Sequence, residues 1–221
     1  MEEPLNKVSF VNGLLDWHKE NNREFPWRKT SDPYKILVSE VLLQKTKAVN
    51  VVPIYNKFTL IYPDAHKLVT ASFDELKSAI EKLGLVNQRA ANLQKLAIIL
   101  VEKHNGKVPD NKIELLELPG VGNYIANAVL CFAFNKDLPL LDTNIGRILE
   151  RVFSIKVAGE ERKKEKVWET IAELLPIGKS REYNYSLIDL GALVCTAKNP
   201  RHNLCPVLEI CDYCKRIKKE K

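Results

Sequence analysis

Apolar residues recur along nearly the whole chain at the spacing of one face of a helix. The first such stripe comprises Val8, Val11, Leu14 and Leu15. No segment shows a convincing alternation of apolar and polar residues, which is the pattern of a half-buried strand. The pattern therefore predicts an all-α fold.

Capping residues and glycines indicate where several helices begin and end. Asp32 followed by Pro33 is typical of a helix start, because aspartate caps the first turn and proline fits its first position. Ser72 and Glu75 form the sequence signature of a capping box. Gly84 is expected to end the helix that this box begins.

Further helices follow from the same periodicity. Asp110 is expected to cap a short helix that runs to Leu118. Pro53 marks either a kink in its helix or the true start of that helix. The other predicted helices span residues 47–62, 88–104, 124–134, 143–152, 167–175 and 183–194.

The order of these helices indicates two helical lobes. Residues 31–134 make a run of about six short helices. The N-terminal helix needs a partner, and the helices that follow residue 135 are expected to provide it. The sequence thus predicts one domain of residues 31–134 and a second of residues 1–30 plus 135–221, with an active-site cleft between them.

Charge and hydropathy narrow the possible partners. The chain has 221 residues and a net charge of +6, which favours nucleic acid, although a lysine-rich surface alone gives the same balance. No apolar run approaches the roughly 18 residues of a membrane span. The acidic start, Met1-Glu2-Glu3-Pro4, lacks the order of a signal peptide. We therefore expect a cytoplasmic, nucleoid-associated protein.

Two glycines lie in a short segment between two predicted helices, residues 118–122, with the sequence L-P-G-V-G. Gly120 and Gly122 allow backbone angles that a Cβ would forbid, so the turn can be very tight. The amides of Gly120, Val121 and Gly122 are expected to point outward at the start of the next helix. Main chain and helix dipole would then bind a phosphate without reading base sequence.

Four of the five cysteines lie close to the C-terminus, at Cys195, Cys205, Cys211 and Cys214. In a reducing compartment, such a group is more typical of a metal site than of a disulfide framework. The sequence therefore predicts a metal centre near the C-terminal end.

The segment 118–122, followed by Asp142, resembles the helix-hairpin-helix–Gly/Pro/Asp superfamily of DNA glycosylases. The cysteines narrow the resemblance to the branch of endonuclease III and the adenine and thymine mismatch glycosylases. Further similar positions are Trp17, Phe25-Pro26-Trp27, Pro33-Tyr34, Ser39-Glu40-Val41 and Asp189-Leu190-Gly191-Ala192. The resemblance implies a six-helix barrel domain beside an iron–sulfur cluster domain. It also implies a base-excision-repair enzyme that acts as a monomer on double-stranded DNA.

Asp142 is the implied catalytic residue. In such enzymes the target nucleotide leaves the base stack, and breaking its N-glycosidic bond develops oxocarbenium character on the sugar. The resemblance implies that Asp142 stabilises this charge and orients or deprotonates the attacking water. The alternative is that Asp142 only caps the helix 143–152. The two roles are compatible, because N-cap geometry fixes the carboxylate.

Tyr124 bears on whether an amine of the protein attacks the sugar. Members of the branch that cut the DNA strand carry a lysine at this place, whose amine forms a Schiff base with the sugar. Tyrosine has no such amine, so the resemblance implies a monofunctional glycosylase that leaves an abasic site. Packing within the helix is the alternative role of Tyr124.

Other implied contacts surround the flipped base. Glu40 lies on an otherwise apolar helix, where an unpaired carboxylate is costly. It either reaches solvent or, as the resemblance implies, binds or protonates the base. Gln44 and Lys45 follow one turn later, and either could fill the gap that the base leaves. Asn144 is expected to support Asp142 or a DNA phosphate.

The sequence leaves two alternatives for the base that is excised, a pyrimidine (thymine or uracil) or adenine. The chain stops at Lys221, where adenine enzymes usually continue into a domain that recognises oxidised guanine, and residues 84–90 resemble the thymine enzyme. Both observations favour thymine or uracil opposite guanine. Ser39-Glu40-Val41 and Gln44 resemble the adenine branch, so a short adenine glycosylase acting opposite guanine or 8-oxoguanine is the alternative. A non-catalytic DNA-binding module is a further alternative, but the presence of Asp142 makes it less favoured.

The iron–sulfur pattern of this branch is Cys-x6-Cys-x2-Cys-x5-Cys. Cys195, Cys205 and Cys211 fit its first, third and fourth places, whereas His202 occupies the second. Cys214 is an extra cysteine beyond the pattern. The resemblance implies a 4Fe–4S cluster whose fourth ligand is either Cys214 or His202. A structural zinc ion is the remaining alternative.

Overall fold

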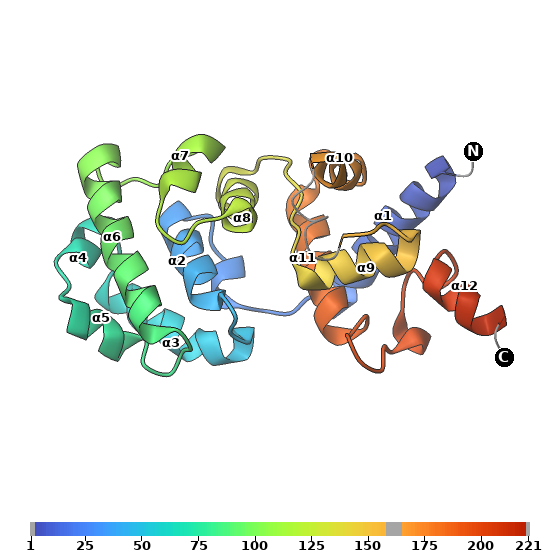
Figure 1. Ribbon diagram of the computed structural model, residues 1–221, viewed down its shortest axis with the longest axis horizontal. Helices are drawn as coiled ribbons and strands as arrows, with labels where there is room; N and C mark the ends of the chain where they lie inside the picture. Colours follow the sequence, from blue (N-terminus) through green and yellow to red (C-terminus); the bar gives the residue numbers. More distant parts are fainter. Residues whose placement is uncertain (1–2, 158–164, 220–221) are drawn as a thin grey trace. The chain divides into compact units, whose positions relative to one another are not determined.

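The computed structural model describes residues 3–157 and 165–219, and every regular element in these ranges is helical (Figure 1). The predicted all-α fold is therefore confirmed. The chain divides into two compact units, Glu24–Lys136 and Met1–Arg23 with Asp137–Lys221. The domain ranges expected from the sequence differ from these limits at residues 24–30 and 135–136. Met1 and Glu2, on which the expected cytoplasmic location partly rests, lie outside the described residues.

The unit Glu24–Lys136 is built around a buried helix. Its elements are η1 (Pro26–Arg28), α2 (Pro33–Leu43), α3 (Ala48–Ile61), α4 (Ala65–Val69), α5 (Phe73–Ala79), α6 (Val86–His104), α7 (Lys112–Glu117) and α8 (Asn123–Phe134). Helix α2 contacts α3, α6 and α8, and α6 packs against α4 and α5. Asp32 caps α2 as expected, since its side chain accepts hydrogen bonds from the amides of Tyr34 and Lys35. Pro53 lies inside α3 and does not begin it.

The other unit joins the two ends of the chain. Its elements are α1 (Glu3–Asn21), α9 (Thr143–Phe153), α10 (Glu165–Glu173), α11 (Ser180–Leu193), η3 (His202–Leu204) and α12 (Asp212–Lys219). Helix α11 packs against α1 and α9, and α9 also contacts α12. Arg23 binds the fully buried Asp189, donating from its amide at 3.1 Å and from Nε at 2.6 Å. These contacts bring the α1 end of the chain onto α11.

The end of α5 differs from the expected position. The helix ends at Ala79, where the amide of Ile80 bonds to the carbonyl oxygens of Leu76 and Lys77. Gly84 lies beyond the helix, and its carbonyl oxygen accepts a hydrogen bond from Arg89. The expectation that Gly84 ends this helix was therefore wrong, because the helix already closes on its own last turn.

The start of α7 is also shifted by one residue. Asn111 caps the helix, accepting a hydrogen bond from the amide of Glu114 at 3.0 Å, so the expected cap at Asp110 was wrong. Helices α4 and α12 did not emerge from the periodicity, because α4 is a single short turn and α12 carries few apolar residues. None of the helices in residues 3–157 and 165–219 combines the length and apolar character needed to cross a membrane.

Candidate active site and metal centre

The turn between α7 and α8 depends on glycine at one position. The amide of Val121 donates to the carbonyl oxygen of Leu118 at 3.1 Å, which closes a four-residue turn. Gly120 has a φ of +80°, as the third residue of a type II turn requires. A Cβ at Gly120 would also lie 2.6 Å from Nδ2 of Asn92. Both backbone angle and space therefore select glycine at Gly120.

This turn leads directly into the N-terminus of α8. The hydrogen bond from the amide of Ala126 to the carbonyl oxygen of Gly122 begins the ladder of the helix, so the amides of Gly122 and Asn123 precede it. Gly122 and Asn123 are exposed, and Tyr124 is partly buried one residue later. The expected outward direction does not hold for the amide of Val121, because that amide is engaged within the turn. The exposed amides lie at Gly122 and the start of α8.

Gln44 is connected to the same turn. Its Nε2 donates a hydrogen bond of 2.8 Å to the carbonyl oxygen of Gly120. The next residue, Lys45, has a left-handed φ of +53°, which is uncommon for a residue with a side chain. The structure thus brings Gln44 to the glycine turn, although the two are distant in sequence.

Arg89 supports the backbone on which Gln44 and Lys45 lie. Its guanidinium donates to the carbonyl oxygens of Val41 at 3.2 Å and Gln44 at 2.6 Å, and also to that of Gly84. The side chain is only 2% exposed, and burial lowers the pKa of its guanidinium. Arg89 was not identified from the sequence as a site residue.

Glu40 faces the interior of its unit. It is 7% exposed on α2, so the alternative in which its carboxylate simply reaches solvent does not hold. Its neighbours on the helix, Ser39 and Val41, are buried as well. Its carboxyl group therefore lies among buried residues and not in solvent.

Asp142 is a fully formed N-cap. Its Oδ1 accepts hydrogen bonds from the amides of Asn144 at 2.9 Å and Ile145 at 2.7 Å. Its Oδ2 accepts from Nδ2 of Asn144 at 3.1 Å. The carboxylate is therefore fixed by three donors at the N-terminus of α9. Asn144 is thus a direct hydrogen-bond partner of the Asp142 carboxylate.

A polar network continues from Asp142 toward the cysteines. Oδ1 of Asn144 accepts a hydrogen bond from Nη2 of Arg147 at 3.0 Å. The same guanidinium donates to the carbonyl oxygen of Cys195 at 2.9 Å and to that of Gly191 at 3.1 Å. Side chains on one turn of α9 thus connect the carboxylate to the backbone of the first cysteine.

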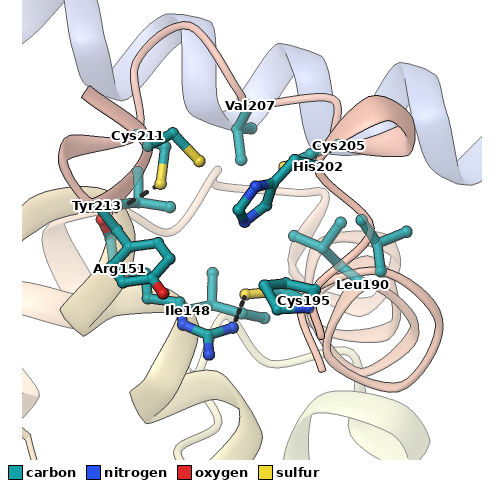
Figure 2. Close-up of a pocket in the computed structure, with 13 residues that line it drawn as sticks. Ile148, Arg151, Leu190, Cys195, His202, Cys205, Val207, Cys211 and Tyr213 are labelled. Carbon is teal, nitrogen blue, oxygen red and sulfur yellow. Dashed lines mark hydrogen bonds between the residues drawn. The ribbon is translucent and has the colours of Figure 1, made fainter. Parts of the chain in front are cut away.

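The four C-terminal cysteines and His202 line one cavity (Figure 2). Its wall includes the apolar side chains of Ile148, Leu190 and Val207. In the part of the chain that the structure describes, no three His, Cys, Asp or Glu side chains converge on a point suited to a single metal ion. The thiols instead lie around the cavity.

The chemistry of this cavity fits a cluster with thiolate ligands. Arg151 donates from Nη1 to Sγ of Cys195 at 3.3 Å, and Sγ of Cys211 donates to the carbonyl oxygen of Arg151 at 3.3 Å. Burial, followed by the neighbouring cysteines, raises the pKa of Cys205 to about 11 and that of Cys214 to about 12. The four thiols line one cavity, where a cluster with thiolate ligands can be held.

The chain belongs to the HhH-GPD superfamily of base excision DNA repair proteins, whose pattern matches residues 38–176. Residues 195–211 match the iron–sulfur binding domain of endonuclease III. The predictions of a helix-hairpin-helix DNA glycosylase and of an iron–sulfur cluster rather than zinc are thereby confirmed.

Individual relatives are similar over most of the chain. A thymine/uracil-DNA glycosylase of Methanothermobacter thermautotrophicus is 36% identical over 215 residues, covering 96% of this chain and 97% of the relative. An adenine DNA glycosylase of Buchnera aphidicola is 37% identical over 208 residues, covering 94% of this chain and 59% of the relative. The solved structure of a thermostable thymine-DNA glycosylase superposes with a TM-score of 0.91 at 35% identity, covering 96% of this chain and 98% of that one.

The sequence reasoning missed the three arginines that organise these sites, Arg89, Arg147 and Arg151. Each binds mainly to backbone carbonyl oxygens of residues distant in sequence. The pattern Asn144-x-x-Arg147 on one helix face was the only local signal, since residues three apart are neighbours on a helix.

Proposed function

We propose that this chain is a monofunctional DNA glycosylase that hydrolyses the N-glycosidic bond of a mismatched base, with thymine or uracil opposite guanine as its substrate. The observation that carries the proposal is the Asp142 carboxylate, fixed by two backbone amides and by Asn144 at the start of α9. In a member of a base excision repair family, an anion held in this way is suited to a cation-like sugar.

Asp142 acts on the sugar and on water. As the bond between the base nitrogen and C1′ breaks, its electron pair leaves with the base, and positive charge develops on the sugar. Both backbone amides bond to Oδ1, which leaves Oδ2 to face the sugar or the attacking water, with Asn144 orienting it. The water adds to C1′ and gives its proton to the carboxylate, so the DNA retains an abasic site.

Two further residues define the outcome at the sugar and the base. Tyr124 offers no amine, so no Schiff base forms and the strand is not cut by elimination. Glu40 is buried, and its carboxyl group binds the flipped base or donates a proton to it as it leaves. These two assignments follow the matching positions of the family.

The proposed DNA contacts come from the backbone of the glycine turn and from the side chains of Gln44 and Lys45. A phosphate binds at the turn formed by Gly120, Val121 and Gly122, where Gly122 and the first amides of α8 supply the donors. Gln44 and Lys45 lie next to this turn and fill the space that the flipped base leaves. Such contacts position the duplex without reading its sequence.

The choice of base is supported by relatives. The thymine/uracil-DNA glycosylase of M. thermautotrophicus is matched over 97% of its length, and residues 84–90 resemble the thymine enzyme. Adenine is the second candidate, favoured by Ser39-Glu40-Val41, by Gln44 and by the 37% identity to the B. aphidicola enzyme.

The cysteine cavity would hold a 4Fe–4S cluster through Cys195, Cys205, Cys211 and one further ligand. When bound, the cluster supplies a structural cross-link that orders the loop of residues 195–211. Lys198 and Arg201 are exposed in this loop and suited to contact with DNA phosphates. We further propose that the protein acts as a monomer.

A set of four duplexes tests the choice of base. Each carries a single T:G, U:G, A:G or A:8-oxoguanine pair, and each is incubated with the protein and resolved with and without alkali. The proposal predicts alkali-dependent cleavage at T:G and U:G. Cleavage of the adenine-containing pairs alone would overturn the proposed substrate, and cleavage without alkali would overturn the monofunctional assignment.

A further inference from the structure

His202 replaces a cysteine in the iron–sulfur segment, and its placement bears on what holds the cluster. It begins η3, and the amide of Cys205 bonds to the carbonyl oxygen of His202 at 3.1 Å. In such a turn, side chains three residues apart project from the same side. The imidazole of His202 and the thiol of Cys205 therefore face the same region, and Figure 2 shows the imidazole directed into the cavity.

Packing fixes the orientation of this imidazole. Its ring meets the ring of Tyr213 edge to face, with the centroids 6.1 Å apart. The guanidinium of Arg151 lies over the same tyrosine, 5.2 Å from its centroid. Within residues 3–157 and 165–219, no side chain hydrogen-bonds to the imidazole of His202, so its nitrogen atoms are available to a group in the cavity.

Cys214 has a different placement. It lies in α12, three residues after Cys211, and both cysteines are buried at the wall of the cavity. The two thiols therefore occupy one side of the cavity together. A 4Fe–4S cluster takes one ligand on each iron. His202 occupies the second place of the cysteine pattern, within the matched residues 195–211, and its imidazole is directed into the cavity, whereas Cys214 lies beyond the last place of that pattern.

We propose that this chain holds its cluster through three thiolates and one imidazole, from Cys195, Cys205, Cys211 and His202, with Cys214 outside the ligand set. Imidazole replaces thiolate in some biological clusters, where it raises the reduction potential. A neutral ligand in place of an anionic one lowers the negative charge of the site, which favours the reduced cluster. The proposal concerns the cluster and not the excised base, so it is independent of the substrate proposed above.

Nitrogen hyperfine coupling tests the ligand directly. The holoprotein is produced with isotopically labelled histidine, its cluster is brought to a paramagnetic state, and pulsed electron paramagnetic resonance is recorded. The wild-type protein should show the coupling of a directly bound histidine nitrogen. His202→Cys should lose this coupling, keep its full iron and sulfide content, and show a lower midpoint potential.

Cys214→Ala is the matched control. It should keep the cluster, the nitrogen coupling and the midpoint potential of the wild-type protein. The absence of a bound-nitrogen coupling in the wild-type holoprotein would overturn the proposal, whatever the folding of the variants. Loss of iron in Cys214→Ala, together with full iron content in His202→Ala, would assign the fourth ligand to Cys214 instead.

Discussion

Arg147 donates a hydrogen bond of 2.9 Å from Nε to the carbonyl oxygen of Cys195. Its Nη2 donates to Oδ1 of Asn144, whose amide group in turn bonds to Asp142. One guanidinium therefore joins the loop that carries the first cysteine to the proposed catalytic carboxylate. A displacement of the loop that carries Cys195 would therefore be transmitted to Asp142 through the side chains of Arg147 and Asn144.

Substitution of Arg147 tests this connection. Arg147→Met keeps much of the aliphatic packing but removes the three hydrogen bonds of the guanidinium, so we expect the excision rate to fall about 10- to 100-fold, as for other groups that orient a functional side chain. Single-turnover excision, measured with cluster content, checks the prediction. A variant with a full cluster and an unchanged rate would show that Asp142 does not depend on Arg147.

Tyr124 can be exchanged for the amine that it lacks. Tyr124→Lys places a lysine near the start of α8, and we expect a covalent complex with DNA that borohydride traps, together with strand cutting without alkali. Tyr124→Phe is the matched control and should still leave an intact abasic site. If neither trapping nor strand cutting appears in the lysine variant while base excision persists, position 124 does not face the sugar.

Arg89 should contribute strongly to stability. Replacing it with methionine leaves the carbonyl oxygens of Val41 and Gln44 without their buried donor, which we expect to cost about 3 kcal/mol of unfolding free energy. Urea unfolding measures the loss. Lys95→Met, an exposed substitution on the same helix, should change stability little. Equal effects of the two substitutions would contradict the role of Arg89.

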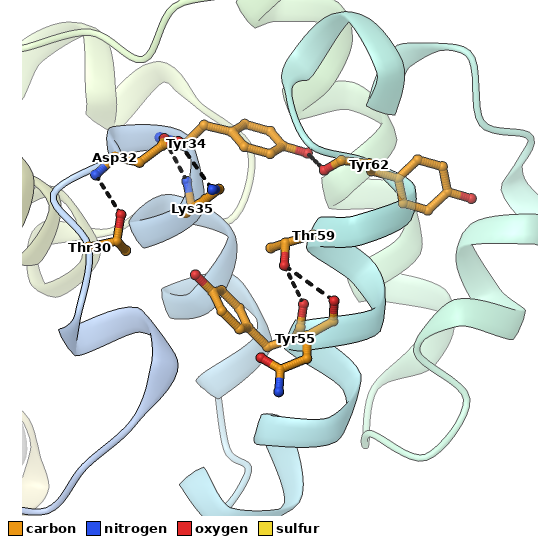
Figure 3. A network of polar contacts seen from close by, with 8 residues as sticks. Thr30, Asp32, Tyr34, Lys35, Tyr55, Thr59 and Tyr62 are labelled. Atoms are coloured by element: carbon orange, nitrogen blue, oxygen red, sulfur yellow. Dashed lines mark hydrogen bonds and ion pairs between the residues drawn. The ribbon is translucent and has the colours of Figure 1, made fainter.

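Buried tyrosines make the fold sensitive to alkali. The hydroxyl of Tyr34 donates to the carbonyl oxygen of Tyr62 at 2.9 Å (Figure 3). Burial, followed by the charges of Asp64 and Asp32, raises the pKa of Tyr34 well above its ordinary value. Burial also raises the pKa of Tyr183, and it raises that of Tyr55 to about 12. All three phenols are therefore more easily ionised in the unfolded chain.

The sign of the pH dependence follows from these shifts. As the pH rises above the ordinary tyrosine value of about 10, the unfolded chain loses protons first, so the folded state loses stability. We expect the melting temperature to fall as the pH rises from about 10 toward about 12. In Tyr183→Phe this fall should be shallower than in the wild-type protein. An identical pH slope in both proteins would exclude Tyr183 as a cause.

The sequence predicted the elements that depend on local chemistry. Asp32 and Asp142 were identifiable because an N-cap is made by the residue and the amides that directly follow it. Gly120 was identifiable because its turn demands a positive φ. Arg89 and Arg147 were not, because their partners are backbone carbonyl oxygens that only the folded chain brings near. The end of α5 was not predictable from Gly84, because the helix ends at Ala79 without a capping glycine.

The release of a free base tests the central claim most directly. The protein is incubated with a duplex carrying one T:G pair, and the small molecules are identified by mass spectrometry. We predict one free thymine per abasic site from the wild-type protein. In Asp142→Asn, which keeps the cap but loses the charge, the rate of thymine release should fall at least about 100-fold. Asp32→Asn, the same change at the cap of α2, should release thymine at the wild-type rate. Absence of free thymine from the wild-type protein, or full activity in Asp142→Asn, would contradict the account.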